Sequence, residues 1–403
     1  MLAKFSGKKF RMLTASKPKQ SVKIVVAYLG LIVLLVGAIW GVGNLSTSIF
    51  STPGVQKPLS TAQESTLLQS LVTQALHNLT HGGGLLMLQI LIILLCTRVM
   101  VYVFKKIGQP AVIGEIVAGI VLGPSLLGLV FPQLSNHVFY PEAIKNLQFF
   151  SYLGLVVFMF ILGMEIDFKS LKENSQRSVF ISHAGIVIPF VLGIVLGLML
   201  YSNFGPHNVP FLVFASFLGV ALSITAFPVL ARIIQEKGLA KEKIGTVALS
   251  IAAVEDVTAW CILALVVSTA KATSVYTSLL TMLFVVVFVA VMLLIVKPLV
   301  QKIYNRFVDG SNVEHLTVVL TMALLLTSTL VTEVFGINGL FGAFVAGLIM
   351  PTDERFRSYI VGRVESFNAI FLLPMFFAVA GLKTQIGELN SLWLVGLCLV
   401  VIA

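Results

Sequence analysis

The sequence predicts an all-α protein that crosses a membrane many times. Of its 403 residues, 58% are hydrophobic and 11% are charged, whereas a soluble domain is about 45–50% apolar and about 25% charged. Apolar stretches of about 20 residues, the length of a helix that spans a bilayer, recur from residue 22 to the end. Continuous runs such as LLMLQILIILL lack the alternation of an outer-membrane β-strand, which excludes a β-barrel.

Each apolar stretch is a candidate membrane span, and the last of them ends with the sequence. In order, the candidates are 22–43, 84–105, 109–131, 147–166, 178–203, 209–234, 243–270, 276–300, 314–335, 337–351, 360–382 and 392–403. The chain then divides into a basic N-terminus with a signal-anchor helix (1–43), an external linker (44–83) and a transmembrane domain (84–403). A cleavable signal sequence is the alternative interpretation of the first apolar run.

The orientation follows from the basic residues, because Lys and Arg in short loops stay on the cytoplasmic side. The formal net charge of +10 is therefore a property of the loops and does not indicate binding to nucleic acid. The first 23 residues are rich in Lys and Arg, and the loops that alternation then puts inside are basic as well, for example at Lys105, Lys169, Lys241, Lys302 and Arg357. We expect a multi-pass protein of the cell inner (plasma) membrane with a cytoplasmic N-terminus.

Four carboxylates lie well inside apolar stretches, namely Glu115, Glu255, Asp256 and Glu333. A charge near the bilayer centre is costly, so each is a functional candidate. A carboxylate in a partly dehydrated cavity can bind either a proton or a monovalent cation, and this competition is the chemistry of an antiporter. Neighbouring helical residues point about 100° apart, so Glu255 and Asp256 do not face one cavity equally. One of the two carboxylates is therefore expected to be the main ion-binding group.

The span before this acidic pair is predicted to break in the middle. It contains LSITAFPVLARI, in which a proline removes a helical hydrogen bond while Ser and Thr can satisfy the freed backbone groups. A broken helix exposes carbonyls and helix ends to an ion at the membrane midplane. The candidate ion ligands here are Ser223 and Thr225, and the candidate broken segment is Ala226, Phe227 and Pro228.

Two glycine-containing segments present small residues four apart, a spacing that lets helices approach closely. Gly119 and Gly123 form one such face, and Gly339, Ala343 and Gly347 form another. We expect these residues to serve helix packing and not to contact the ion.

Taken together, these residues resemble the cation/proton antiporter-2 family, which includes bacterial Na⁺/H⁺ and K⁺/H⁺ antiporters, glutathione-gated K⁺ efflux systems and plant cation/H⁺ exchangers. The resemblance rests on PAVIGEIVAGIVLGPSLLG, LSITAFPVLARI, AAVEDVTAW, FGAFVAGLIMP and LLPMFFAVAGLKTQIG, which follow the family's order and spacing over about residues 84–390.

The resemblance implies an inverted-repeat Na⁺/H⁺ antiporter fold with a dimerisation domain and a mobile core, and hence a homodimer in the lipid bilayer. It implies Asp256 as the carrier of the proton or monovalent cation, Na⁺ or K⁺, and no cofactor. Family members carry Asp-Asp, Asn-Asp or Gln-Asp at the acidic pair, whereas this chain has Glu255 and Asp256. The family's next span, with its intramembrane lysine, has no counterpart here, so the second repeat is expected to be incomplete in this chain.

Two other functions compete with antiport. A gated K⁺ efflux channel or sensor on the same scaffold is the alternative, and it would require a nucleotide-binding regulatory domain. An intramembrane aspartyl protease needs two catalytic aspartates on separate helices, but the other carboxylates inside the apolar stretches, besides Asp256, are all glutamates. No enzymatic activity is therefore expected.

The predicted topology can be tested by cysteine labelling in intact cells, in a background that lacks the native Cys96, Cys261 and Cys398. Lys241→Cys should react with a membrane-impermeant maleimide only after permeabilisation, because its loop is cytoplasmic. Ser60→Cys, in the external linker, should react without permeabilisation. Strong labelling of Lys241→Cys in intact cells would reject the orientation.

Overall fold

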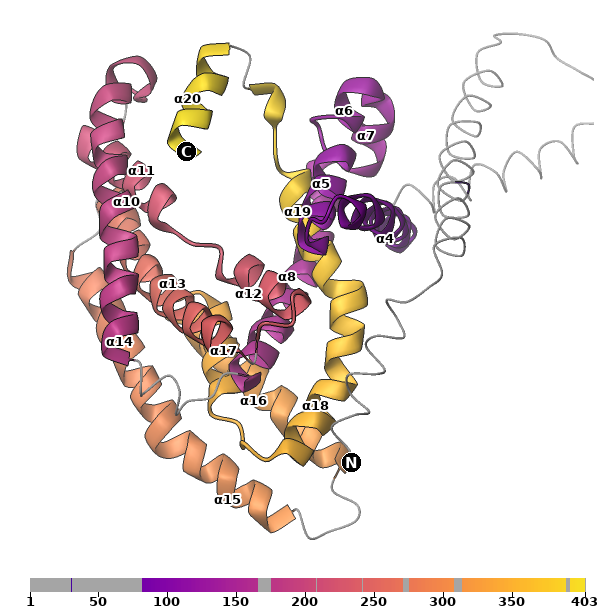
Figure 1. The fold of residues 1–403 in the computed structure, drawn as a ribbon, viewed down its shortest axis with the longest axis vertical. Coiled ribbons are helices and arrows are strands. Elements are labelled where there is room, and N and C mark those ends of the chain that lie inside the picture. The colour runs from indigo at the N-terminus through magenta and orange to yellow at the C-terminus, as the bar shows by residue number, and fades with distance from the viewer. Residues whose placement is uncertain are drawn as a thin grey trace, which may run out of the picture. The chain divides into compact units, whose positions relative to one another are not determined.

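A computed structural model of the chain describes Gly30 and residues 82–165, 175–207, 209–240, 242–270, 275–307, 314–388 and 392–402. All regular elements in these ranges are helical (Figure 1), and eight helical segments among them are long and apolar enough to cross a membrane. The predicted all-α, polytopic class is therefore confirmed. The expected signal-anchor helix and linker lie outside the described residues, except for Gly30 and for Gly82 and Gly83, which begin the first helix after the linker.

Backbone contacts divide the chain into two compact units. One contains the described residues up to Ser151 together with Pro374 onward, and the other contains Tyr152–Leu373. The first unit holds α4 (Gly82–Lys106), α5 (Ala111–Leu122), α6 (Leu127–Val130), α7 (Pro132–Val138), the start of α8 (Pro141–Glu165), most of α19 (Leu373–Leu382), a 3₁₀ turn (Ile386–Glu388) and α20 (Leu392–Ile402).

In the first unit, the expected span 109–131 corresponds to the apolar helical segment Ala111–Val130, which begins with the shorter helix α5. This helix ends at Leu122 because Gly123 is followed by Pro124, and a residue that precedes proline disfavours the helical conformation. The two expected packing glycines of α5 face α19. A Cβ atom on Gly119 would clash with the carbonyl oxygen of Ala378, and one on Gly123 would lie 3.0 Å from the carbonyl oxygen of Leu382. These short distances are consistent with the prediction that Gly119 and Gly123 serve helix packing.

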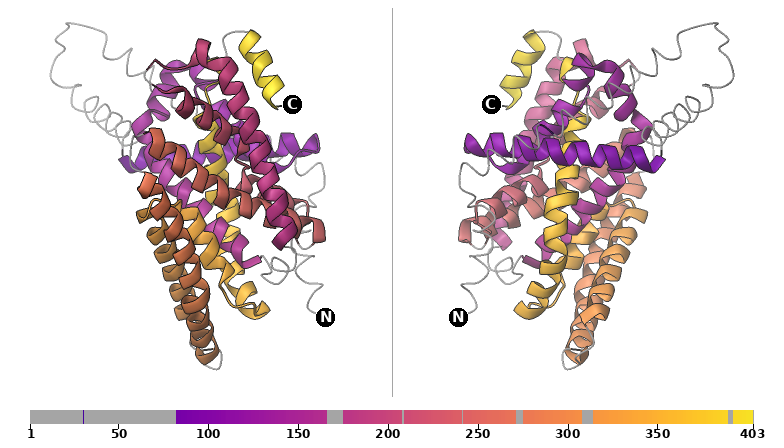
Figure 2. Two further views of the ribbon diagram at one scale, coloured as in Figure 1. Left: turned by 90° about the vertical axis from the view of Figure 1, so that its left-hand side faces the viewer. Right: turned by 90° about the vertical axis from the view of Figure 1, so that its right-hand side faces the viewer.

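The second unit holds the rest of α8 and the helices that surround the acidic pair. These are α10 (Ser175–Phe204), α11 (Phe211–Ser223), α12 (Phe227–Glu236), α13 (Lys243–Ala270), α14 (Val275–Val291), α15 (Lys297–Phe307), α16 (Glu314–Val334), α17 (Gly339–Leu348) and α18 (Glu354–Phe367), with π-helical turns at Met292–Val296 and Asn368–Leu372. Figure 2 shows the α14–α15 pair and α16 running side by side, and the rings of Phe284 and Phe335 stack between them at 3.7 Å.

Side-chain caps begin two helices of this unit. Asn338 accepts a hydrogen bond from the amide of Leu340, and Asp353 accepts from the amides of Arg355 and Phe356. The amides of Phe356 and Arg355 hold the pKa of Asp353 below its ordinary value. Because Asp353 caps α18, the helix begins at Glu354, six residues before the expected span 360–382.

The short helix α17 is buried along nearly its whole length. With ten residues it is about 15 Å long, so the expected span 337–351 does not cross a bilayer as a helix by itself. A Cβ atom on Gly347 would clash with the carbonyl oxygen of Phe160 on α8, so the missing side chain lets the two helices lie close together. At Gly339 the neighbours are side-chain atoms instead, the hydroxyl of Tyr152 and a carboxylate oxygen of Glu333.

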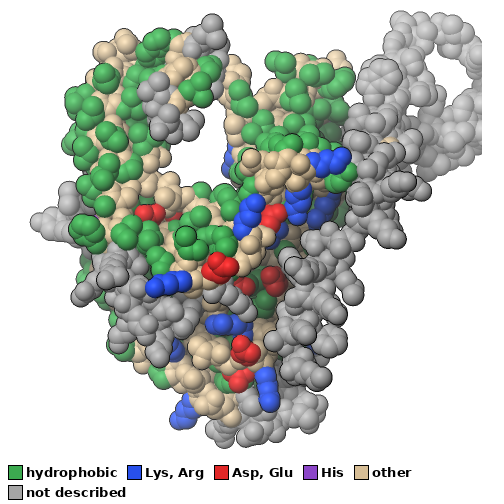
Figure 3. Space-filling view, in the orientation of Figure 1, with side chains coloured by type: hydrophobic (Ala, Val, Ile, Leu, Met, Phe, Trp, Pro, Cys, Tyr) green, Lys and Arg blue, Asp and Glu red, His purple; other side chains and the backbone are tan. Residues whose placement is uncertain are grey.

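Helix α10 carries an exposed apolar surface of the kind that faces lipid. Phe180, Ile188, Leu192, Leu198 and Met199 are each at least 60% exposed. Figure 3 shows hydrophobic side chains covering this helix. Such a continuous apolar surface fits a position at the bilayer boundary.

The close approach of α5 to α19 predicts that Gly119→Ala lowers stability by about 1–3 kcal/mol, because the new methyl group meets main-chain atoms that cannot move independently. Thermal unfolding in detergent would measure the loss. Gly362→Ala is the matched control, since no atom lies within 4 Å of its new Cβ atom. Equal unfolding temperatures for the two variants would contradict the close contact.

Candidate ion-binding site

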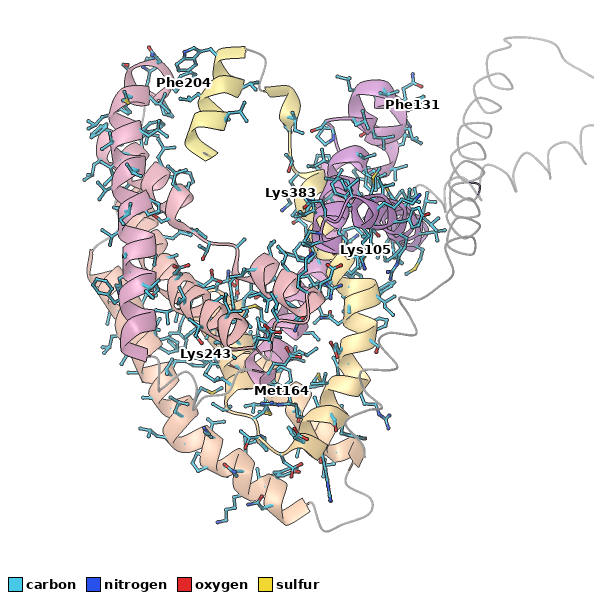
Figure 4. All side chains as sticks on the ribbon, in the orientation of Figure 1. Lys105, Phe131, Met164, Phe204, Lys243 and Lys383 are labelled. Carbon is cyan, nitrogen blue, oxygen red and sulfur yellow. The ribbon has the colours of Figure 1, made fainter. Side chains whose placement is uncertain are left out.

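The acidic pair lies in the middle of α13, a helix that packs against α10, α11, α12 and α14. Glu255 is 8% exposed and Asp256 is 7% exposed. In Figure 4, Lys243 marks the first residue of α13, and Met164 lies near the end of α8, which belongs to the same unit. Two adjacent carboxylates buried in a membrane helix need polar partners close by.

The predicted break in the preceding span is present, and it separates α11 from α12 (Figure 1). Helix α11 ends at Ser223, residues 224–226 are not helical, and α12 begins at Phe227. The break therefore ends earlier than expected, because Phe227 and Pro228 belong to the first turn of α12. Proline suits that position, where its fixed φ is helical and its missing N–H is not needed.

The glutamate of the pair reaches this break with its side chain. The hydroxyl of Thr225 donates a hydrogen bond of 3.0 Å to Oε2 of Glu255. The other carboxylate oxygen, Oε1, lies beside Gly185 on α10, only 2.6 Å from where a Cβ atom of that residue would stand. The carboxylate of Glu255 is thus held between α10 and the break.

The aspartate reaches the same break from the next position of α13. The backbone N–H of Phe227, the first residue of α12, interacts with its carboxylate, and so does the nearby charge of Glu255. The N-terminus of a helix favours negative charge, so this is a stabilising position for Asp256. Although the two positions diverge on α13, both carboxylates converge on residues 225–227, because the longer side chain of Glu255 reaches back to Thr225.

The break itself is accessible, whereas the acidic pair is buried. Ile224, Thr225 and Ala226 are exposed. Pro228 cannot donate to the carbonyl of Ile224, four residues earlier, so this part of the backbone offers an oxygen that a regular helix would not. The arrangement therefore combines two carboxylates, a hydroxyl and main-chain oxygens, which are the hard oxygen ligands that alkali cations take.

Ser223, the other expected ion ligand, has a different position. Its hydroxyl donates to the carbonyl oxygens of Gly219 at 2.7 Å and Ile186 at 3.0 Å. The second of these bonds ties the end of α11 to α10. Ser223 thus fixes where the break begins.

Polar contacts at its far end hold α12 as well. The side-chain amide of Gln235 donates to Glu165 of α8 at 2.8 Å. Glu365 of α18 attracts Arg232 of α12 and repels the like charge of Glu165. These residues were not recognised as a group from the sequence, because their contacts join three separate helices and no local pattern connects them.

The remaining intramembrane glutamates differ in their surroundings. Glu115 is 3% exposed and belongs to the first unit. Glu333 is exposed at the end of α16, where its Oε2 atom accepts from the hydroxyl of Tyr152 at 2.9 Å and from the amide of Gly339 at 2.8 Å. Glu333 thus joins α8, α16 and the start of α17.

Comparison with known proteins shows close relatives. Residues 90–403 match the family described as sodium/hydrogen exchanger, transmembrane. The chain is 43% identical to cation/H(+) antiporter 17 of Arabidopsis thaliana over 82% of its own length and 40% of the relative. It is 36% identical to the Na(+)/H(+) antiporter NhaS4 of Synechocystis, over 79% of this chain and 78% of that protein. Identity to K(+)/H(+) antiporter 1 of Saccharomyces cerevisiae is 30%, over 78% of this chain and 37% of that protein. The chain thus spans about two fifths of the plant and yeast relatives.

The contacts of Glu333 predict a structural role for this residue. Glu333→Ala should lower the unfolding temperature in detergent, since the amide of Gly339 and the hydroxyl of Tyr152 both lose their acceptor. The expected loss in the free energy of unfolding is about 1–2 kcal/mol. Glu333→Gln keeps an acceptor oxygen and should lose less. Tyr152→Phe, which removes one of the two bonds, is the control. An unchanged unfolding temperature in Glu333→Ala would refute the role.

Proposed function

The chain belongs to the sodium/hydrogen exchanger family, and we propose from this membership and from the site that it is a secondary active transporter that exchanges monovalent cations for protons. The observation that carries the proposal is the meeting of two buried carboxylates at an exposed break between two helices. Such a break provides polar backbone groups at the depth where a transporter binds its ion. The transported ions are Na⁺ or K⁺ and H⁺, and the exchange needs neither a cofactor nor enzymatic chemistry.

Asp256 is the proposed carrier. Its negative charge can be neutralised by a proton or by a cation, but the two do not bind together at one carboxylate. When neither a proton nor a cation is bound, the N–H of Phe227 helps to stabilise the ionised carboxylate of Asp256. When a cation leaves Asp256 on one side of the membrane, a proton binds there in its place. The proton is then carried across and released on the other side.

Glu255 is the proposed second acidic group of the site, and Thr225 supplies a hydroxyl oxygen beside it. The hydroxyl donates its proton to Glu255, so its lone pairs remain available to a cation. Ser223, whose hydroxyl contacts two carbonyl oxygens, has a positioning role in this proposal. The printed names of the relatives include both Na⁺/H⁺ and K⁺/H⁺ antiporters, which supports a monovalent cation as the substrate class.

We also propose the setting in which exchange takes place. The basic loops favour a cytoplasmic N-terminus, and the apolar helices indicate a multi-pass membrane position, for which the plasma membrane is our proposal. The proposed assembly is a homodimer surrounded by lipid. No nucleic acid is expected to bind, since the positive charge is distributed over loops that border a membrane.

The two carboxylates should respond differently to neutral substitutions. Asp256→Asn should abolish cation-dependent proton movement in membrane vesicles, because the amide neither titrates nor carries a full negative charge. Glu255→Gln should leave exchange working and change its response to an imposed membrane potential, which acts on each translocated charge with about 2.3 kcal/mol per 100 mV.

The measurement is dye-reported proton flux after addition of Na⁺ or K⁺, with and without the potential, on variants matched for expression and unfolding temperature. Full exchange by Asp256→Asn would refute the assignment of Asp256 as the carrier. Loss of all exchange in Glu255→Gln would show that the two carboxylates are ranked in the wrong order.

A further inference from the structure

Gly185 differs from the other close-packed glycines of α10. A Cβ atom on Gly193 would lie 2.5 Å from the Cα atom of Gly219, and one on Gly197 would lie 2.9 Å from the Cα atom of Ala215. Both of these glycines therefore face the backbone of α11 and let the two helices touch. The atoms within 4 Å of a Cβ atom on Gly185 belong instead to the carboxylate of Glu255. The space at Gly185 is thus filled by a charged side chain from another helix.

This space lies where α10 is adapted to the site. Pro189 follows Gly185 by four residues and cannot donate to its carbonyl, so the regular hydrogen bonding of α10 is interrupted at this level. The neighbouring carbonyl of Ile186 accepts the bond from Ser223 that ties α10 to the end of α11. Gly185 therefore belongs to the part of α10 that borders the break.

The length of the glutamate side chain matches this space. One carboxylate oxygen of Glu255 occupies the position beside Gly185, while the other accepts the bond from Thr225. An aspartate at this position would be one methylene group shorter and would not extend as far from α13. The two oxygens thus bridge α10 and the break.

We propose that Gly185 is a positioning residue for the second carboxylate of the ion site: its missing side chain leaves the space in which Glu255 is held against Thr225. This inference rests on the proposed exchange function, and it identifies a residue that sets the affinity of the ion site for the cation. A methyl group at position 185 would meet the mobile end of a side chain and not a backbone, so the carboxylate moves while the helices stay in place. Its bond to Thr225 is then lost.

The test compares Gly185→Ala in three backgrounds, with Glu, Asp or Ala at position 255. With Glu255, the alanine should raise the cation concentration for half-maximal exchange about tenfold, the effect of losing a hydrogen bond to a charged group. It should leave the unfolding temperature nearly unchanged. In the Glu255→Asp and Glu255→Ala backgrounds, the alanine should have no further effect on exchange, because no carboxylate reaches the space.

Gly193→Ala is the matched control, because its added methyl group meets the backbone of α11 and no carboxylate. It should lower the unfolding temperature by the same amount in all three backgrounds. If Gly185→Ala behaves like this control, with equal losses whatever residue stands at 255, then Gly185 serves helix packing and the inference is overturned. The same holds if exchange with Glu255 is unaffected by the alanine.

A second readout separates this inference from the proposed function. Unfolding temperatures in detergent at neutral pH, with and without Na⁺ or K⁺, report binding to the folded protein without transport. Absence of exchange in the unmodified full-length protein would reject the function. Coupling between positions 185 and 255 in the cation-induced stabilisation would still support the positioning role, and its absence would reject it.

Discussion

The arrangement of the second unit depends on one constraint, namely that a carboxylate inside a bilayer needs polar partners, and regular helices have none to offer. In an unbroken helix every amide and carbonyl is already bonded within the helix. The chain meets the constraint by ending α11 at Ser223 and beginning α12 at Phe227, at the level of the acidic pair. Asp256 then takes its contact from a main-chain amide and Glu255 takes its contact from a hydroxyl. Without the break, the acidic pair would lose both partners, and without the pair the break would have no charge to bind.

This geometry requires helices that lie unusually close together, and glycines make the approach possible in two ways. At Gly163 and Gly347, the main chains of α8 and α17 meet directly, so that an added methyl group would have to move a helix. At Gly185, the space is filled by a carboxylate that rotates about several bonds. The first kind of glycine determines the shape of the scaffold, and the second kind determines where a functional side chain lies.

The predictions that succeeded rest on local properties of the sequence. The expected span 243–270 coincides with α13, and the proline and hydroxyl residues indicated the break, because apolar length and proline act on the segment that contains them. The contacts of the site are not local. Nothing in SHAGIVIPF distinguishes the glycine that faces a carboxylate from those that face a backbone, and Gln235 gives no sign of its bond to Glu165. Likewise, α17 reads as a span in the sequence, yet its ten helical residues are covered by neighbours that only the fold brings together.

The two acidic positions differ in how far substitution can change their surroundings. The group that interacts with Asp256 is a backbone amide, which no side-chain replacement at Phe227 removes except proline, so its position follows from the course of the chain. The carboxylate of Glu255 contacts the hydroxyl of Thr225 and occupies the space left by the missing side chain of Gly185, and single substitutions at Thr225 or Gly185 change either of these surroundings. The surroundings of Asp256 are therefore maintained wherever the break between α11 and α12 is maintained. The side chain at position 255 can vary in length and charge, provided that positions 225 and 185 vary with it.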